Sequence, residues 1–345
     1  AVFSNGSSAT IYSFSGGAWG VSLDGGTASV AVRFVDFGSY TIALNFMYNT
    51  YTSMRFWNAG TSRHWHNSGN PINPQNMWGR ACNVGEVFKN RVYLAGDTSA
   101  EGHPSRLYFS SIISTAGNIT WAPTVDFVDI NPGDGESITA LKRFSQELLI
   151  FKPNYLYRFR TSGVEPDAVI KVGTRSQESV VEGKMGVYFH HDSGIYRYNG
   201  GYPKEISRPI NDFIAAIPRT QFDGIASWSD ADHIYFSVGN LTITDALGSE
   251  VRRNTVLRYT ESGDLWTIYS YGQDVRRGMT YVTASQLSRL VGFDNGIVAT
   301  QNSGTTDLGE PIEWRFRTNW QDFGSTATQK TIETIAAVCE KAQGT

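Results

Sequence analysis

Hydrophobic and polar positions alternate along this chain in short runs that recur as pairs. An apolar run is followed, one turn later, by a run that reads aromatic or aliphatic, then Arg or Tyr, then aromatic. The second run occurs five times, at residues 54–57, 107–109, 157–159, 196–198 and 257–259, and its upstream partners cover 40–44, 92–95, 148–151, 187–189 and 233–237. Alternation with a period of two is typical of β-strands, so each pair predicts an antiparallel hairpin.

The spacing of these pairs predicts a repeated β-sheet module. Phe37, Phe88 and Phe144 each precede a short polar turn and an apolar strand, at separations of 51 and 56 residues. Propeller blades recur about every 40 to 50 residues, and loop insertions lengthen that period. We therefore expect an all-β fold, a β-propeller of six to seven antiparallel blades with minor short helices. Six repeats fall at about 30–58, 81–111, 137–163, 179–207, 223–272 and 275–304, within a propeller over 1–310.

The two ends of the chain leave the blade number open. A strand pattern at 10–14 has no apparent upstream partner, and another at 331–338 lies near the last residue. Either the two ends pair and assemble a seventh blade, or native sequence extends beyond both. Residues 311–345 are expected to be a β segment that closes the propeller or leads into a further β domain.

One helix and several loops are expected between the strands. Ile210, Phe213, Ile214 and Ile217 have helical spacing, after Pro209 and before Pro218. The polar segments 59–80, 96–105, 161–178 and 240–253 are interpreted as loops.

The repeated central position of the second run is occupied by Arg or Tyr. Its members are Arg55, Tyr108, Arg158, Arg197 and Arg258. Because they recur at corresponding places, a structural role in each blade is the simplest interpretation, with the stem packed on aromatics and the head bonded to the next blade. The alternative is a ring of positive charge that faces a lumen.

Composition excludes several classes of protein. The formal net charge of −3 over 345 residues lacks the Lys and Arg surplus that general nucleic-acid binding needs. No apolar run is long enough to span a membrane, and no secretory signal opens the sequence. Cys82 and Cys339 are expected to be reduced, buried thiols unless the fold brings them together.

Several residues suggest chemistry but have a plainer interpretation. His64 and His66 share one face of a strand without an obvious third ligand, and His190 and His191 point to opposite faces. Residues 129–136 resemble a calcium loop, but Pro132 and the strand-like flanks favour an Asx-type turn. Asp230 and Asp232 are a weak candidate for glycoside hydrolysis. We expect no catalytic, cofactor or metal site, and Trp65 and Trp78 are possible partner-surface aromatics.

The wording of the repeats resembles a family of bacteriophage tail proteins. The matching phrases are DINPGDGESITAL (129–141), LLIFK (148–152), YLYRF (155–159), KNRVYLA (89–95), RLYFS (106–110), GVYF (186–189), GIYRYNG (194–200), IS (206–207) with the short helix, IEWRFRT (312–318), FG (323–324) and Lys330. The group is the β-propeller tail-hub or nozzle proteins of short-tailed double-stranded DNA phages, of the packaged-DNA stabilisation type. The resemblance covers most of residues 30–345, and the upstream strands and docking elements of the family are not found.

This resemblance implies a structural protein of the virion. It implies no catalysis and no cofactor, assembly with itself as a six-fold ring, and contacts with the portal or adaptor and other tail proteins. Double-stranded DNA would pass through the conduit without sequence-specific binding, and the protein would be made in the host cytoplasm. The alternatives are a carbohydrate-binding propeller that recognises host-surface glycans and, less favoured, a propeller glycoside hydrolase.

Overall fold

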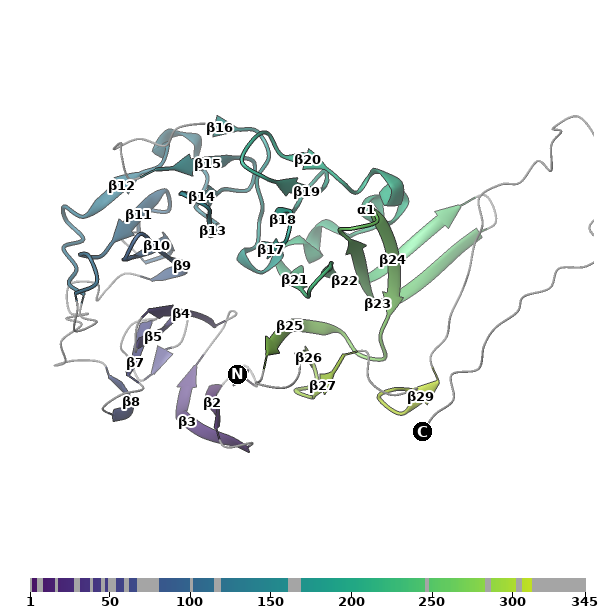
Figure 1. Ribbon diagram of the computed structural model, residues 1–345, viewed down its shortest axis with the longest axis horizontal. Coiled ribbons are helices and arrows are strands. Elements are labelled where there is room, and N and C mark those ends of the chain that lie inside the picture. The colour runs from purple at the N-terminus through teal and green to yellow at the C-terminus, as the bar shows by residue number, and fades with distance from the viewer. Residues whose placement is uncertain are drawn as a thin grey trace, which may run out of the picture.

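The computed structural model describes residues 2–4, 9–15, 18–27, 32–37, 40–44, 47–48, 54–58, 62–66, 81–99, 102–114, 119–160, 169–245, 248–282, 287–301 and 306–311. These residues form seven antiparallel sheets that follow one another around a common centre, and a separate two-stranded hairpin (Figure 1). Sheets of about four strands arranged radially define a β-propeller, as the sequence predicted.

The seven sheets are numbered here as blades 1 to 7 in chain order. Blade 1 comprises β1 (Val2–Ser4), β2 (Ala9–Ser15), β3 (Ala18–Thr27) and β6 (Met47–Tyr48), and blade 2 comprises β4 (Arg33–Phe37), β5 (Tyr40–Leu44), β7 (Met54–Asn58) and β8 (Ser62–His66). Blade 3 comprises β9 (Cys82–Phe88), β10 (Arg91–Asp97), β11 (Arg106–Phe109) and β12 (Phe127–Asp129), and blade 4 comprises β13 (Ala140–Phe144), β14 (Glu147–Phe151), β15 (Leu156–Phe159) and β16 (Val169–Ile170).

The remaining blades follow the same order of strands. Blade 5 comprises β17 (Val181–Gly183), β18 (Gly186–His191), β19 (Gly194–Tyr198) and β20 (Lys204–Glu205), and blade 6 comprises β21 (Ala226–Ser229), β22 (His233–Asp245), β23 (Gly248–Thr260) and β24 (Leu265–Ser270). Blade 7 has β25 (Val275–Val282), β26 (Leu287–Phe293) and β27 (Val298–Thr300), and β28 (Thr306–Asp307) pairs with β29 (Glu310–Pro311). In blades 2 to 7 the first strand lies innermost: β9 lies beside β4 and β13, and β21 beside β17 and β25.

The paired runs are the second and third strands of blades 2 to 6. The central residue of each third strand lies opposite the middle of the second: Arg55 opposite Ala43, Tyr108 opposite Leu94, Arg158 opposite Leu149, Arg197 opposite Tyr188 and Arg258 opposite Tyr235. The predicted hairpins are therefore confirmed, and the five repeated residues occupy one structural position.

The core lies between blades rather than within one. In blade 4, Tyr157 and Phe159 pack toward blade 3, where Phe159 meets Tyr93 with ring centroids 6.0 Å apart. From the opposite face, Phe151 meets Phe189 of blade 5 at 5.0 Å. Because both faces of a blade are covered, its central strands are apolar at nearly every position, which explains the apolar runs in the sequence.

The helices lie in the connections between blades. They are the 3-10 helices η2 (Pro132–Asp134), η3 (Gln177–Ser179), η4 (Arg208–Ile210) and η5 (Arg219–Gly224), and α1 (Asn211–Ala215). Helix α1 confirms the predicted helix: Ile210, Ile214 and Ile217 are buried on one side of it, and Pro218 ends the turn that follows.

Several expectations about strands and loops were wrong. The segments 59–80 and 161–178, interpreted as loops, contain β8 and β16, the fourth strands of blades 2 and 4. Residues 240–253 are not a loop, because β22 and β23 are 13 residues each and run almost to the hairpin tip. Leu241 and Ile243 alternate there with Thr242 and Thr244, and the apolar pair packs on the blade 6 core. The strand at 10–14 does have an upstream partner, because β2 pairs with β1.

The blade that the six predicted repeats leave out is blade 1, which is formed by the beginning of the chain. Among the described residues, blade 1 is built entirely within residues 2–48, without a strand from the C-terminal end. Residues 312–345, and with them the predicted strand at 331–338, lie outside the described residues.

Candidate functional site

The third-strand arginines occupy equivalent places in blades 4, 5 and 6, and each side chain is half-buried. Arg158 donates to the carbonyl of Gly200 in blade 5 at 3.4 Å and lies 4.0 Å from Glu147. Arg197 contacts the Met185 sulfur at 3.8 Å. The predicted bond to the next blade is therefore seen for Arg158, whereas Arg197 makes its contact within its own blade.

Arg258 in blade 6 also bonds within its blade. It donates to the Thr267 hydroxyl at 3.1 Å, and its guanidinium lies 5.1 Å from the centre of the Tyr269 ring. The predicted packing of an arginine stem against aromatics is thus present at this position.

These three arginines are paired less fully than others in the described part of the chain. Arg106 and Arg175 each form a two-bond fork with one carboxylate, Asp129 and Asp192 respectively, at 2.7 to 2.9 Å. The Nε atoms of the third-strand arginines are buried and have no hydrogen-bond partner: Arg158, Arg197 and Arg258. Their positive charge is consequently only partly neutralised within the described residues.

The other predicted site residues fall partly outside the described side chains. Tyr108 is fully buried and donates to Asp97 at 3.2 Å, a structural bond within blade 3. Arg55 lies in β7 and Trp65 in β8, and only their backbones belong to the described part of the chain. Trp78 lies outside the described residues. Cys82 is buried in β9, and Cys339 lies outside the described residues.

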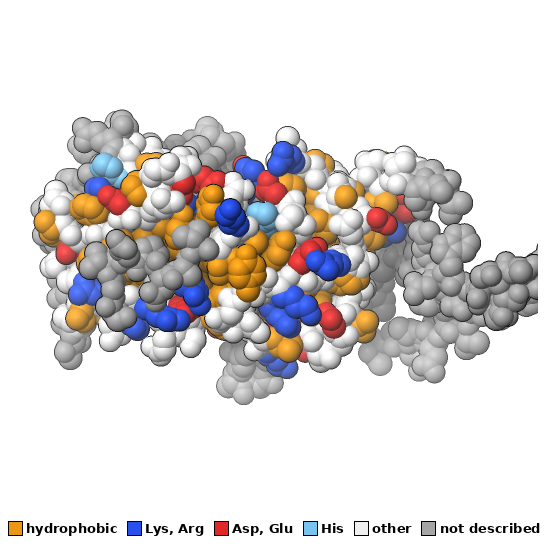
Figure 2. Space-filling view, turned by 90° about the horizontal axis from the view of Figure 1, so that it is seen from above, with side chains coloured by type: hydrophobic (Ala, Val, Ile, Leu, Met, Phe, Trp, Pro, Cys, Tyr) orange, Lys and Arg blue, Asp and Glu red, His pale blue; other side chains and the backbone are white. Residues whose placement is uncertain are grey.

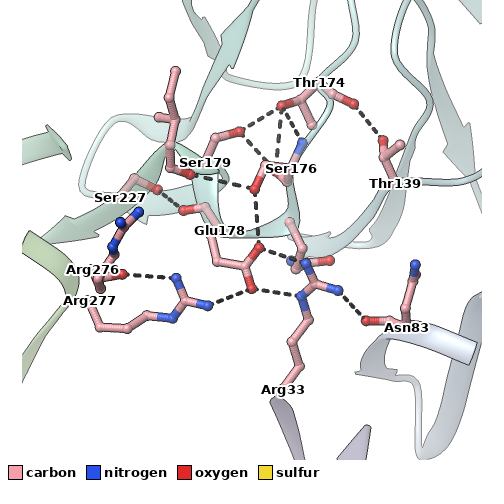
Figure 3. Close-up of polar contacts among 12 residues, drawn as sticks. Arg33, Asn83, Thr139, Thr174, Ser176, Glu178, Ser179, Ser227, Arg276 and Arg277 are labelled. Carbon is pink, nitrogen blue, oxygen red and sulfur yellow. Dashed lines mark hydrogen bonds and ion pairs between the residues drawn. The ribbon is translucent and has the colours of Figure 1, made fainter. Parts of the chain in front are cut away.

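A cluster that sequence reasoning missed lies where the innermost strands converge. Glu178 in η3 accepts a fork from Arg33 of β4, with both distances 2.7 Å, and a bond from Arg277 of β25 at 3.0 Å (Figure 3). Arg33 also donates to the carbonyl of Asn83 at 2.6 Å. The three charged groups come from blade 2, from the connection between blades 4 and 5, and from blade 7. These parts are not neighbours in the ring, so the cluster ties the propeller together across its centre.

The environment of Glu178 keeps its carboxylate charged. Burial alone would raise the pKa, since only 11% of the side chain is exposed, but the bonds and charges of Arg33 and then Arg277 lower it below its usual value. Ser176 donates to the same carboxylate at 3.1 Å, and Ser227 donates to the Glu178 backbone carbonyl at 2.8 Å (Figure 3). Glu178 is therefore held from both ends and serves as an anchor.

The acidic pair weighed for glycoside hydrolysis is used in structural bonds. Asp230 is nearly fully buried and contacts His233 at 2.8 Å, the Tyr235 hydroxyl at 3.0 Å and Arg289 at 2.8 Å. Asp232 accepts a bond from the Ser262 hydroxyl. Burial would raise the pKa of Asp230, but its hydrogen bonds lower it, so this carboxyl group is not held protonated as a general acid would be.

The histidine pair divides between core and surface, as predicted. His190 is 3% exposed and packs edge-on against Phe222 with ring centroids 4.9 Å apart, and burial lowers its pKa to about 4. His191 is half-buried on the opposite face, and its Nδ1 lies 2.8 Å from the Ser193 hydroxyl. Side chains at 64 and 66 are outside the described set.

The calcium-like segment holds an ammonium group from the protein itself. Lys152 is fully buried, and its Nζ lies 2.7 and 2.8 Å from the Asp134 oxygens, 3.0 Å from the Ser105 hydroxyl and 3.1 Å from the carbonyl of Asn131. Asp134 also accepts the backbone N–H of Glu136 at 2.9 Å, which confirms the Asx-type turn. The oxygens that resemble metal ligands are therefore occupied by Lys152.

Two further features, a metal centre and a membrane-spanning helix, are absent from the described residues. No group of three or more His, Cys, Asp or Glu side chains there is arranged to hold a metal ion. No helix within the same ranges is long and apolar enough to cross a membrane.

Comparisons with known proteins add nothing to the fold described above. No protein-family model and no curated protein matches the sequence. Among solved structures, the chain is similar to one described as the crystal structure of the mitotic checkpoint complex, at 9% identity and a TM-score of 0.47, over 85% of this chain and 83% of that one. A similarity this distant carries no information on function.

Proposed function

We propose that this protein is a structural component of a phage virion, a propeller subunit of the tail hub or nozzle. Copies of the chain would assemble into a ring, six-fold in the resembling family, that contacts the portal or adaptor and other tail proteins. The ring would form part of the conduit through which DNA leaves the particle and would help to retain the packaged genome before ejection.

The observation that carries this proposal is the use made of the ionisable side chains. Four acidic side chains bind partners from other strands or blades and so stabilise the propeller: Glu178, Asp230, Asp134 and Glu147. Such bonds favour a rigid scaffold whose function lies in its contacts. The phrases that resemble tail-hub proteins suggest the particular assembly, and both observations favour a non-catalytic role.

Mass spectrometry of purified virions tests the proposal. The chain should be present at a few to a dozen copies per particle, measured against the major capsid protein, and imaging should place it on the tail axis. Absence from the particles would overturn the proposal. Glycan binding would then be measured next, with exposed aromatics such as Tyr202 as the first residues to substitute.

A further inference from the structure

The strand order gives the propeller two different faces. In an antiparallel blade, the turn after the first strand and the turn after the third strand emerge on the same side of the disc. We call this side the turn face. In blades 4 and 5 it carries the turns at 145–146 and 184–185 and the loop at 199–203, whereas the opposite side carries the connections between blades.

Positive side chains gather on the turn face of blades 4 and 5. Arg143 is the penultimate residue of β13, Lys184 lies in the turn after β17, Lys204 begins β20, and all three are exposed. Arg158 and Arg197 add their guanidinium groups, which reach Gly200 and Met185 at this end of the strands. We call these five residues the basic arc. Figure 2 shows the molecule at right angles to the view of Figure 1, with Lys and Arg side chains in blue.

The basic arc is poorly matched by carboxylates of the described residues. Only Arg158 has one within 4.0 Å, Glu147, and that carboxylate is shared with Arg160 and the Tyr198 hydroxyl. Glu86 is half-buried and acts electrostatically on Lys142 and Arg143, and burial raises its pKa. Within the described residues, the basic arc therefore leaves positive charge without a matching carboxylate on the surface of blades 4 and 5.

Glu182 of β17 is 48% exposed and pairs with Lys142 at 3.1 Å, whereas Glu261 is turned inward. Glu261 is 5% exposed and accepts the backbone N–H groups of Lys184 and Met185 at 3.0 and 2.9 Å, as well as the Tyr188 hydroxyl at 2.7 Å. Its charge therefore organises the turn that presents Lys184. More exposed acids, Asp232 and Asp264, lie in the turns of blade 6 and limit the arc to blades 4 and 5.

We propose that the basic arc contacts the phosphate backbone of double-stranded DNA. This inference rests on the proposed function, in which DNA passes the protein, and it identifies the basic arc as the surface that faces the DNA. Guanidinium groups fit phosphate oxygens well, and a patch of lysines and arginines without base-reading elements gives sequence-independent contact. The chain as a whole is acidic, with a net charge of −3, so the contact is local and weak. DNA can then be guided without being held.

The test is binding of short duplex DNA of two unrelated sequences, measured by fluorescence anisotropy at rising salt. Both duplexes should bind equally, and affinity should fall roughly 100-fold between 50 and 200 mM salt if about four phosphates are neutralised. An absence of binding at the lower salt would overturn the proposal, and so would a clear preference for one sequence.

Matched variants assign the binding to the basic arc. Arg143→Gln/Lys184→Gln/Lys204→Gln removes three exposed charges and should weaken binding at least tenfold. A control, Lys171→Gln/Arg208→Gln/Arg219→Gln, removes three exposed charges from the connections on the opposite face and should change affinity less than twofold. Equal losses in the two variants would show that only net charge matters and would refute the arc.

A second variant examines the half-buried pair. Arg158→Gln/Arg197→Gln should weaken binding further, provided that its thermal unfolding shows a folded protein. The exposed triple variant keeps the proposal testable if this pair fails to fold. The result is separable from the proposed function. If the chain is found in virions but does not bind duplex DNA, the DNA-binding role of the basic arc is refuted and the proposed function is not. Binding of phosphate-bearing lipopolysaccharide in place of DNA would likewise reject it.

Discussion

At the scale of single residues, the buried ionisable groups decide how this protein responds to substitution and to pH. Lys152 is the clearest example, because an ammonium with no exposure sits among four oxygens that the chain has arranged around it. Breaking a buried ion pair on one side leaves the other charge without compensation.

Lys152→Met should therefore destabilise the fold by about 3 to 5 kcal/mol, since Asp134 remains largely buried without its countercharge. Chemical denaturation monitored by fluorescence measures the change in unfolding free energy. Lys171→Met, at an exposed position, is the matched control and should change stability little. A Lys152→Met protein as stable as the control would show that the cage contributes nothing.

His190 should make the protein less stable in mild acid. Its pKa falls from 6.5 to about 4 on folding, so the unfolded chain takes up a proton that the folded one refuses. Its contribution is complete above pH 6.5 and declines as the pH falls toward 4, by roughly 3 kcal/mol in total. Stability curves of wild type and His190→Leu between these pH values should differ in slope. Parallel curves would contradict the assignment.

At the scale of elements, the approach of neighbouring blades depends on small residues at particular places. A Cβ at Gly278 of β25 would lie 2.3 Å from the Trp228 indole of β21, whereas a Cβ at Gly292 of β26 would meet nothing within 4 Å. The close packing of blades 6 and 7 therefore depends on the absence of a side chain at Gly278, which leaves room for the Trp228 indole.

Gly278→Ala should cost about 1 to 3 kcal/mol, because the indole or the strand must shift. Gly292→Ala makes the same chemical change in the same blade and should be nearly neutral. Thermal unfolding of the two variants side by side gives the comparison. Equal melting temperatures would mean that the contact between the blades yields easily.

Sequence predicted most of these elements, and the reasons for its failures are specific. The paired runs were found because blades covered on both faces leave long apolar strands such as β14. The outer half of the β22–β23 hairpin was missed because polar Thr residues and a bulge around Gly239 obscure its alternation. The short β1 was missed because three residues carry too little pattern.

At the scale of the whole molecule, the decisive contacts join residues that are far apart in sequence. Glu178 is separated from Arg33 by 145 residues and from Arg277 by 99, so no local pattern marks them as partners. Only closure of the ring brings their strands together. The basic arc likewise appears only when strand order assigns each turn to one face.

Glu178→Gln should weaken the propeller as a unit. The amide cannot compensate two arginines, so we expect a loss of about 2 to 4 kcal/mol in unfolding free energy. Glu182→Gln, whose side chain is 48% exposed beside Lys142, is the matched control and should cost less than about 1 kcal/mol. Calorimetry gives both values. A Glu178→Gln protein that unfolds like the control would remove the cross-ring role.

The same three residues also set an order for synthesis. Arg33 and Glu178 have both left the ribosome before blades 6 and 7 exist, so their fork can hold blades 2 to 5 as a partial arc. Arg277 is synthesised 99 residues after Glu178 and adds its hydrogen bond to a carboxylate that Arg33 already binds. Blades 2 to 5 can thus be arranged before the last two blades are synthesised.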